Sequence, residues 1–426
     1  MRVVTVGTGM AATEFVQRLR LGGFTGDVEM LGDEDFPPYS PCVIPFFLAG
    51  EPLSTVYWKG LDFYERHRVR ARLGDPVVEV DAARRRVRTA GGTTVAYDKL
   101  FFATGGRSWY PRREWLQTRG VFGFKTLTDM LGIDRYVRET RTRRAVVFGG
   151  GFIGVDAALA LRHRGLEVTI VHRNTRLLSQ MTDEDGGRFA TARIARKTGI
   201  DVRLRTTVEE LRASGGQLTA VRLATGEWLE TPLLVVSIGV SPNAEPLGRA
   251  EKGVEADEQM RADPDVYVAG DVARTRHRIT GATGIYATYP NAMMQARVAA
   301  RHLLTGSGAF AGSLNTNVLK KHVDFPIVSA GSFSGEPVTW QRGDVWRRVY
   351  LADGKIKGYL IVGDVWGAGH VYDLYVSQKR VDRTIGAILS RPGPGSCHAL
   401  AVGAGLHARG SGRAGLLVPS ARNVIR

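Results

Sequence analysis

Cysteine is nearly absent from this 426-residue chain, which contains only Cys42 and Cys397. Two cysteines cannot form the disulfide framework that stabilises small secreted domains. Apolar runs are also short, and none approaches the roughly 20 residues that a membrane-spanning helix needs. A strand-like run, Val3 to Val6, follows Arg2 directly, which argues against a signal peptide. These absences predict a soluble, cytoplasmic protein that has no membrane segment.

Acidic residues are outnumbered, with 42 Asp and Glu against 58 Lys and Arg, and the net charge is +16 at pH 7. Such an excess can attract nucleic acid, anionic cofactors or acidic partners. The basic residues are scattered apart from short clusters at 84–86 and 141–144, and no nucleic-acid-binding motif accompanies them. We therefore expect an anionic cofactor or an acidic partner rather than nucleic acid. The length predicts two or three domains.

Glycines mark one stretch, residues 144–176, which reads as strand, turn, helix and strand. Gly149, Gly151 and Gly154 form the pattern G-x-G-x-x-G directly after an apolar run. In such a unit the first glycine permits a tight turn, the second lets the backbone approach a pyrophosphate, and the third lets the helix pack on the strand. The helix start offers free N–H groups to the phosphates. The stretch therefore indicates a dinucleotide-binding fold.

The same arrangement occurs at the N-terminus. A strand is followed by G-x-G-x-x-A at residues 7–12, then by a helix to about Leu21 and a second strand at 28–31. Just past that strand, Asp33, or failing that Glu34, could accept hydrogen bonds from the ribose of an adenosine. Two dinucleotide folds in one chain are a much more specific signal than either motif alone.

Small residues end three further strand-like runs. Thr104 and Gly105 end one run, Gly239 ends a second, and Gly270 with Asp271 ends a third. A ligand can approach the backbone closely at such turns, because glycine has no side chain to obstruct it.

Cys42 lies in a Ser-Pro-Cys turn ahead of an apolar run. A thiol at a turn or helix start can have a lowered pKa and take part in redox chemistry. The alternative is a small buried apolar side chain, since free cysteine is among the most buried residue types. The residues alone leave both interpretations open.

Taken in order, these motifs resemble those of the FAD-dependent pyridine nucleotide-disulfide oxidoreductase superfamily, over about residues 1–390. The matching motifs are G-x-G-x-x-A at 7–12, Ala-Thr-Gly at 103–105, G-x-G-x-x-G at 149–154, Ile-Gly with Pro-Asn at 238–243, and Val-Ala-Gly-Asp at 268–271. The resemblance implies an α/β fold with two Rossmann-like dinucleotide-binding domains, one for FAD and one for NAD(P), and a small α+β C-terminal domain. It also implies that Asp271 touches the flavin ribitol.

The resemblance divides the chain into expected domains. The FAD-binding domain comprises residues 1–113 and 238–308, the NAD(P)-binding domain 114–237, and a C-terminal dimerisation and acceptor-side domain 309–390. The tail, 391–426, contains no Asp or Glu and is expected to be disordered. The expected assembly is a homodimer.

The segment around Cys42 narrows the expected function. Tyr39-Ser40-Pro41-Cys42, with Pro45 and Gly50, resembles the single-cysteine branch, which includes coenzyme A-disulfide reductases and NADH oxidases. There the matching cysteine lies by the flavin, away from the nicotinamide. Other relatives with a similar segment are electron-transfer subunits of nitrite reductases or 2-oxoacid dehydrogenases, and these need not keep the cysteine.

We therefore expect an FAD-dependent NAD(P)H oxidoreductase whose catalytic residue, Cys42, passes electrons to a small thiol or disulfide acceptor or to oxygen. One alternative is an electron-transfer flavoprotein that reduces a ferredoxin-like or catalytic partner protein. A second is a non-enzymatic flavoprotein redox sensor. No metal is expected.

Two positions of the second fold depart from the family pattern. Asp156 stands where the family usually has Glu, and His172-Arg173 stands where NADH-selective members usually carry an acid. Arg173 and Arg176 could instead bind a 2′-phosphate, although either could simply face solvent. We therefore expect NADPH to be favoured over NADH. The expected cofactor-binding residues are Gly7, Gly9, Met10, Ala11, Ala12, Asp33, Glu34, Thr104, Gly105, Gly149, Gly151, Phe152, Ile153, Gly154, Asp156, His172, Arg173, Arg176, Gly239, Gly270 and Asp271.

Overall fold

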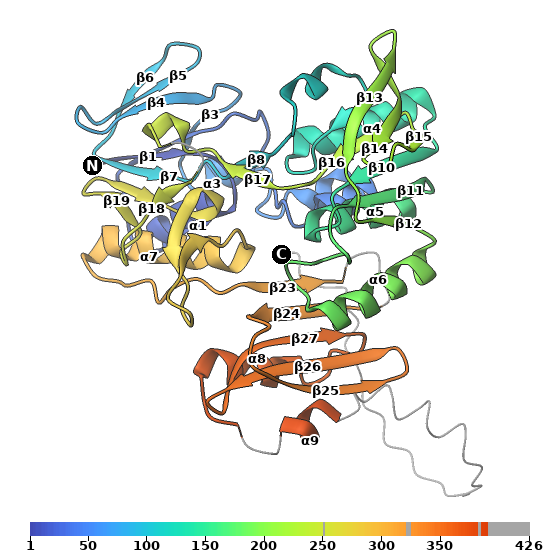
Figure 1. Cartoon of the computed structure of the whole chain (residues 1–426). Coiled ribbons are helices and arrows are strands. Elements are labelled where there is room, and N and C mark those ends of the chain that lie inside the picture. The colour runs from blue at the N-terminus through green and yellow to red at the C-terminus, as the bar shows by residue number, and fades with distance from the viewer. Residues whose placement is uncertain (250–251, 321–324, 382–384, 391–426) are drawn as a thin grey trace, which may run out of the picture.

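The computed structural model describes residues 1–249, 252–320, 325–381 and 385–390. Two folds built on parallel sheets stand side by side, and an antiparallel sheet lies below them (Figure 1). The tail predicted to be disordered, which includes Cys397, lies outside the described residues.

The first fold is a six-stranded sheet in the order β19-β20-β7-β1-β2-β3. Its strands are β1 (Arg2–Val6), β2 (Asp27–Leu31), β3 (Arg70–Arg72), β7 (Lys99–Phe102), β20 (Val266–Val268) and, antiparallel at one edge, β19 (Arg261–Asp263). Helices α1 (Met10–Leu21) and α7 (Tyr289–Thr305) contact each other and share the core of this fold. Helix α1 ends where Gly22 and Gly23 follow.

The second fold is a five-stranded parallel sheet in the order β12-β11-β10-β16-β9. Its strands are β9 (Val121–Phe122), β10 (Arg144–Phe148), β11 (Glu167–His172), β12 (Asp201–Leu204) and β16 (Leu234–Val236). Its helices are α4 (Leu127–Thr140), α5 (Phe152–His163) and α6 (Glu184–Thr198). The central strands are buried along most of their length, as strands covered on both faces are.

The two folds correspond strand for strand. The order β3-β2-β1-β7 matches β12-β11-β10-β16, and each series has a three-stranded antiparallel sheet inserted before its last strand. These inserted sheets are β4 (Val77–Asp81), β5 (Arg86–Thr89) and β6 (Thr94–Ala96), and β13 (Val208–Ser214), β14 (Gln217–Leu223) and β15 (Trp228–Glu230). The predicted α/β architecture with two Rossmann-like folds is confirmed.

The chain crosses between the folds twice, through β8 (Gly106–Ser108) and β17 (Val240–Pro242), which pair antiparallel (Figure 1). Asn243 joins the two crossings, because its side chain donates to the Thr104 carbonyl at 3.0 Å and its carbonyl accepts from the Thr104 hydroxyl at 2.6 Å. The expected domain bounds at 113 and 237 lie a few residues from these strands and stay predictions.

The third sheet is antiparallel, in the order β23-β24-β27-β26-β25. Its elements are β23 (Thr316–Leu319), β24 (Ile327–Gly331), β25 (Glu336–Arg342), β26 (Val345–Ala352) and β27 (Lys355–Val362), with α8 (Ala368–Ser377) and α9 (Ile385–Ser390). Helix α6 of the second fold packs on β26 and β27. Tyr350 donates to Asp183 at 2.8 Å, and Arg348 pairs with Asp185 at 3.2 Å. The third sheet is thus held to the second fold.

The remaining elements are short. They are α2 (Ile44–Leu48), α3 (Phe63–Arg66), the strands β18 (Val254–Glu255), β21 (Ala273–Arg276) and β22 (Thr283–Ile285), and the 3-10 turns η1 (Leu53–Val56), η2 (Arg113–Gln117), η3 (Glu245–Leu247) and η4 (Gly270–Val272).

The two glycine motifs differ in the size of the residue at their last position, which is Gly154 in the second fold and Ala12 in the first. A Cβ on Gly154 would lie 1.9 Å from the Gly149 carbonyl oxygen, whereas the first fold accommodates Ala12 at the corresponding place. We expect Gly154→Ala to destabilise the protein by about 1–3 kcal/mol, because the backbone of the turn must shift. Thermal unfolding measures the loss. Gly151→Ala is the control, since its Cβ would meet nothing within 4 Å. Equal melting temperatures for the two variants would contradict this account.

Candidate functional site

The first glycine turn joins β1 to α1. Gly7 has φ +107°, and a Cβ there would lie 2.2 Å from the Ala103 carbonyl oxygen. Gly9 differs, because a Cβ on it would meet nothing within 4 Å. The first turn of α1, which includes Met10, Ala11 and Ala12, contains no acid. The turn therefore packs tightly against the sheet and is open on its outer side, as a pyrophosphate cradle requires.

The second turn repeats this geometry between β10 and α5. Gly149 has φ +122°, and its Cβ would lie 2.0 Å from the Ser237 carbonyl oxygen. A Cβ on Gly151 would again meet nothing within 4 Å. Phe152 and Ile153 form the first helical residues, which likewise include no acid. Both turns fit a dinucleotide pyrophosphate in shape and charge.

Glu34 is engaged within the protein. Its carboxylate accepts from the Tyr39 hydroxyl and from the backbone N–H and hydroxyl of Thr128, at the start of α4. Asp33 is exposed, and within the described part of the chain no hydrogen bond or ion pair holds it. Of the two acids, Asp33 is therefore the one left free to meet a ribose.

Three small-residue turns lie at the carboxyl ends of strands, two in the first fold and one in the second. Thr104 and Gly105 follow β7, and Gly270 with Asp271 follows the adjacent β20. Gly239 follows β16 of the second fold. In open α/β sheets, the carboxyl ends of the strands form the edge that binds ligands.

Sequence reasoning missed two partners of the Gly270-Asp271 turn. Lys125 pairs with Asp271 at 2.6 Å, and each side chain is about 20% exposed. Gln295, buried on α7, accepts from the Gly270 N–H at 2.8 Å. Nothing in the sequence singled out either residue, because the contacts span 146 and 25 positions.

Cys42 is exposed, which contradicts its interpretation as a small buried apolar side chain. It lies two residues before α2, a helix of five residues. Tyr289, at the start of α7, is its neighbour, and burial raises the pKa of this tyrosine with smaller contributions from Glu14 and Cys42. The Tyr289 ring meets Trp58 with centroids 6.0 Å apart. The thiol therefore stands beside exposed aromatic side chains.

The residues expected to determine the choice between NADPH and NADH lie at the end of β11. His172 is 8% exposed, and its Nδ1 accepts from the Gly150 N–H at 3.1 Å. Burial, with help from Arg173 and Arg176, lowers the pKa of His172 to about 4, so it is neutral at pH 7. Asp156, on α5, is buried.

The two arginines differ in availability. Arg176 pairs with Glu184 and donates to the Thr182 carbonyl at 3.0 Å. Arg173 is exposed, and among the residues that the structure describes none forms a hydrogen bond or ion pair with it. The free cation at the strand end is thus Arg173.

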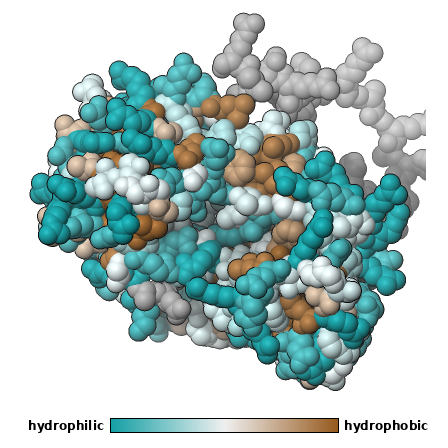
Figure 2. Space-filling view, turned by 90° about the horizontal axis from the view of Figure 1, so that it is seen from above, coloured by the Kyte–Doolittle hydropathy of each residue, from teal (hydrophilic) through white to brown (hydrophobic). Residues whose placement is uncertain are grey.

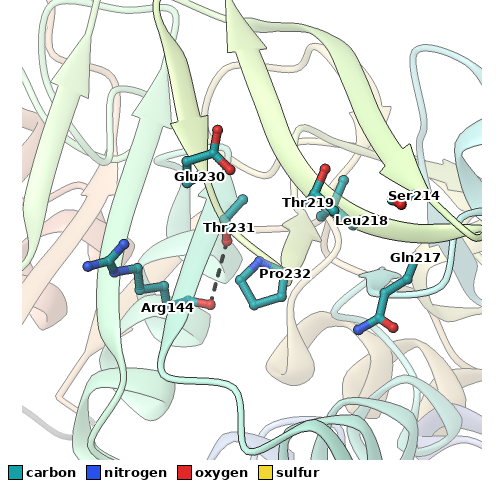
Figure 3. Close-up of a pocket in the computed structure, with 8 residues that line it drawn as sticks. All are labelled: Arg144, Ser214, Gln217, Leu218, Thr219, Glu230, Thr231 and Pro232. Atoms are coloured by element: carbon teal, nitrogen blue, oxygen red, sulfur yellow. Dashed lines mark hydrogen bonds between the residues drawn. The ribbon is translucent and has the colours of Figure 1, made fainter.

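A shallow pocket of about 360 Å³ lies elsewhere, between the start of β10 and the inserted sheet of the second fold (Figure 3). Its lining includes Arg144 and Glu230, which pair with Glu167 and Arg212 respectively. Because Arg144 begins β10, this pocket lies at the amino end of the strand, opposite the glycine turn. It is therefore separate from the candidate nucleotide sites.

Neither a metal cluster nor a membrane helix is found in the described ranges. No group of three or more His, Cys, Asp or Glu side chains there could hold a metal ion, and no helix there is long and apolar enough to cross a membrane. In Figure 2, hydrophilic residues cover most of one face and apolar residues gather in small, separate patches.

Comparison with known proteins now identifies the family. The model of the pyridine nucleotide-disulphide oxidoreductases matches residues 1–299. Rhodocoxin reductase of Rhodococcus erythropolis is 30% identical over 313 residues, which cover 71% of this chain and 72% of the relative. Subunit epsilon of the NADH-dependent phenylglyoxylate dehydrogenase of Aromatoleum evansii is 28% identical over 90% of this chain and 93% of the subunit. The matched part of the large subunit of the Escherichia coli NADH nitrite reductase, 27% identical, is 46% of that protein.

Solved structures agree on the fold. The covalent putidaredoxin reductase–putidaredoxin complex superposes with a TM-score of 0.83 at 24% identity, covering 95% of this chain and 99% of that one. The ferredoxin reductase for the CYP199A2 system of Rhodopseudomonas palustris gives 0.80 at 25% identity, covering 89% and 95%. The family model and the curated relatives show that the chain belongs to the pyridine nucleotide-disulphide oxidoreductase family and is an FAD-dependent NAD(P)H oxidoreductase.

Proposed function

We propose that FAD binds on the first glycine turn, that NADPH binds on the second, and that electrons leave the protein beside Cys42. The observation that carries this proposal is the open side of each turn at Gly9 and Gly151, where an added Cβ would meet nothing within 4 Å. Flavin, when bound, accepts hydride from NADPH and supplies two electrons to an acceptor. The protein contributes binding, orientation and charge.

The residues proposed for FAD fall into two groups. The turn at 7–12 would hold the pyrophosphate, and Asp33 would accept from the adenosine ribose. Thr104, Gly105, Gly270 and Asp271 would meet the flavin end of the cofactor. The ion pair with Lys125 orients the Asp271 carboxylate there.

For the second nucleotide we propose that Arg173 binds the 2′-phosphate of NADPH. A free guanidinium suits a phosphate through paired, charge-assisted hydrogen bonds. The strand end carries neutral His172 where an acid would repel that phosphate. Arg176 is held by Glu184 and would add positive potential rather than a direct bond.

At Cys42 we propose thiol–disulfide chemistry with a small acceptor. The thiolate attacks one sulfur of the acceptor disulfide, forming a mixed disulfide and releasing one thiol. The two electrons from NADPH then cleave the mixed disulfide, which restores Cys42 and releases the second thiol. In total, one disulfide, one NADPH and one proton yield two thiols and NADP⁺.

A second candidate is electron transfer to an acidic carrier protein, and a surface beside Cys42 favours it. Trp58, Tyr289 and Met294 are 37%, 38% and 49% exposed. Arg18 and Arg297 flank them, each 44% exposed, while the Glu14 that pairs with both is buried. Aromatic, Met and Arg side chains of this kind are enriched in protein interfaces. In this case one NADPH reduces two one-electron carriers and releases one proton.

FAD binding is tested at the first turn. We expect purified wild-type protein to be yellow and Gly9→Val to be colourless, because valine would occupy the space open to the pyrophosphate. Gly151→Val is the matched control, which should keep the flavin and lose NADPH-dependent flavin reduction. Absorbance at the flavin bands measures both. A colourless wild type that FAD cannot reconstitute would refute the assignment.

Nucleotide preference is tested at Arg173. We expect Arg173→Ala to lower the ratio of kcat/KM for NADPH to that for NADH roughly tenfold or more, since a lost phosphate contact costs on the order of 1.5–3 kcal/mol. Arg188→Ala, an exposed position on α6, should leave the ratio unchanged. A wild type that prefers NADH would show that Arg173 has been misinterpreted.

The acceptor is tested at Cys42. We expect Cys42→Ser to retain flavin reduction by NADPH and to lose turnover of disulfide or persulfide acceptors, because serine cannot form the mixed disulfide. Stopped-flow and steady-state assays separate the two steps. Unchanged turnover with every small acceptor, together with activity toward an acidic [2Fe–2S] ferredoxin, would favour the carrier-protein candidate instead.

A further inference from the structure

The two nucleotide folds can be compared residue by residue at their glycine turns. In the first, Val6 pairs with Leu31, and Gly7 donates to the Leu31 carbonyl at 2.7 Å. In the second, Phe148 pairs with Val171 in the same register, and Gly149 donates to the Val171 carbonyl at 2.9 Å. The residue that follows Leu31 in the first fold is Gly32, and the residue that follows Val171 in the second, the last of β11, is His172. The middle residue of the turn is Thr8 in one and Gly150 in the other.

At these two positions the glycine and the larger side chain change places between the folds. A Cβ on Gly32 would lie 2.8 Å from Thr8 Cγ2, so Thr8 fills the space between turn and strand in the first fold. A Cβ on Gly150 would lie 2.5 Å from Leu177 Cδ2 and 2.8 Å from His172 Cγ, so these two side chains fill that space in the second. The side chain at these two positions therefore belongs to the turn residue Thr8 in the first fold and to the strand residue His172 in the second.

The exchange changes how the turn is held. In the second fold, the His172 Nδ1 accepts from the Gly150 N–H at 3.1 Å, and the Gly150 carbonyl accepts from the Leu178 N–H at 2.7 Å. Leu178 is fully buried at φ +55°, a left-handed conformation that is strained for a bulky side chain. The segment 172–178 thus forms hydrogen bonds with both the N–H and the carbonyl group of Gly150.

We propose that His172 is a positioning residue for NADPH, which acts by fixing Gly150 so that Gly151 and the first N–H groups of α5 face the pyrophosphate. The proposal rests on the assignment of NADPH to the second fold. His172 acts through the turn rather than on the cofactor, because Nδ1 is occupied by Gly150 and Nε2 lies 3.5 Å from the Ser179 hydroxyl. A neutral acceptor at this position also leaves Arg173 as the unpaired charge where the proposed 2′-phosphate would bind.

Two substitutions separate the acceptor from the bulk of the imidazole. His172→Leu keeps most of the volume and removes the acceptor, whereas the side-chain oxygen of His172→Asn can still accept from Gly150. We expect His172→Leu to raise the KM for NADPH about tenfold, with kcat and FAD content nearly unchanged, since one buried N–H loses its partner. His172→Asn should stay within about threefold of the wild type. Equal KM values for the two variants would overturn the proposal.

A double variant covers the case in which His172→Leu does not fold. His172→Gly with Gly150→Thr reproduces the Gly32 and Thr8 pair of the first fold. Each single change should raise the KM for NADPH more than the double change does. Additive effects would mean that the two positions are independent and would overturn the proposal.

The Gly151→Val control distinguishes a failure of this proposal from a failure of the assignment of NADPH to the second fold. If Gly151→Val leaves the KM for NADPH unchanged, the placement of NADPH on the second fold fails. If Gly151→Val abolishes NADPH use while His172→Leu has no effect, only the role of His172 fails.

Discussion

The structure depends on a close backbone contact between each glycine turn and the residue that follows a neighbouring strand. A Cβ on Gly7 would lie 2.2 Å from the Ala103 carbonyl oxygen, and one on Gly149 would lie 2.0 Å from that of Ser237. Only glycine permits this approach, and both residues also have positive φ. The contact holds each glycine turn against the end of the strand beside it. It thereby fixes the segment from which α1 and α5 begin.

Contacts between the folds build the region where the two cofactors would meet. The pairing of β8 with β17 and the Asn243–Thr104 hydrogen bonds fix the crossing points of the chain. Lys125, just before α4 of the second fold, pairs with Asp271 of the first at 2.6 Å. This partly buried pair is screened less than a surface pair, so it can hold the carboxylate in one orientation. The region between the folds is thus charged and ordered without any metal cluster among the described residues.

The large positive charge is distributed in a way that bears on function. Many arginines are paired, such as Arg72 with Glu29 and Arg164 with Asp134. Arg173, at the end of β11, is exposed without such a partner in the described part of the chain. The net charge of +16 therefore does not require a nucleic-acid partner, because much of the positive charge is paired within the protein and an exposed cation such as Arg173 would suit a nucleotide phosphate equally well.

Sequence by itself determined the architecture, because glycine spacing and apolar runs are local signals of local geometry. The turns at Gly7 and Gly149, the strands beside them and the small-residue strand ends could all be placed before the structure was known. Tertiary structure alone decided which side chains are free. It showed that Glu34 and Arg176 are bound within the protein, that Cys42 is exposed, and that His172 supports the glycine turn. It also brought Lys125 to Asp271 across 146 positions. Such contacts join residues distant in the chain, and no local pattern of residues encodes them.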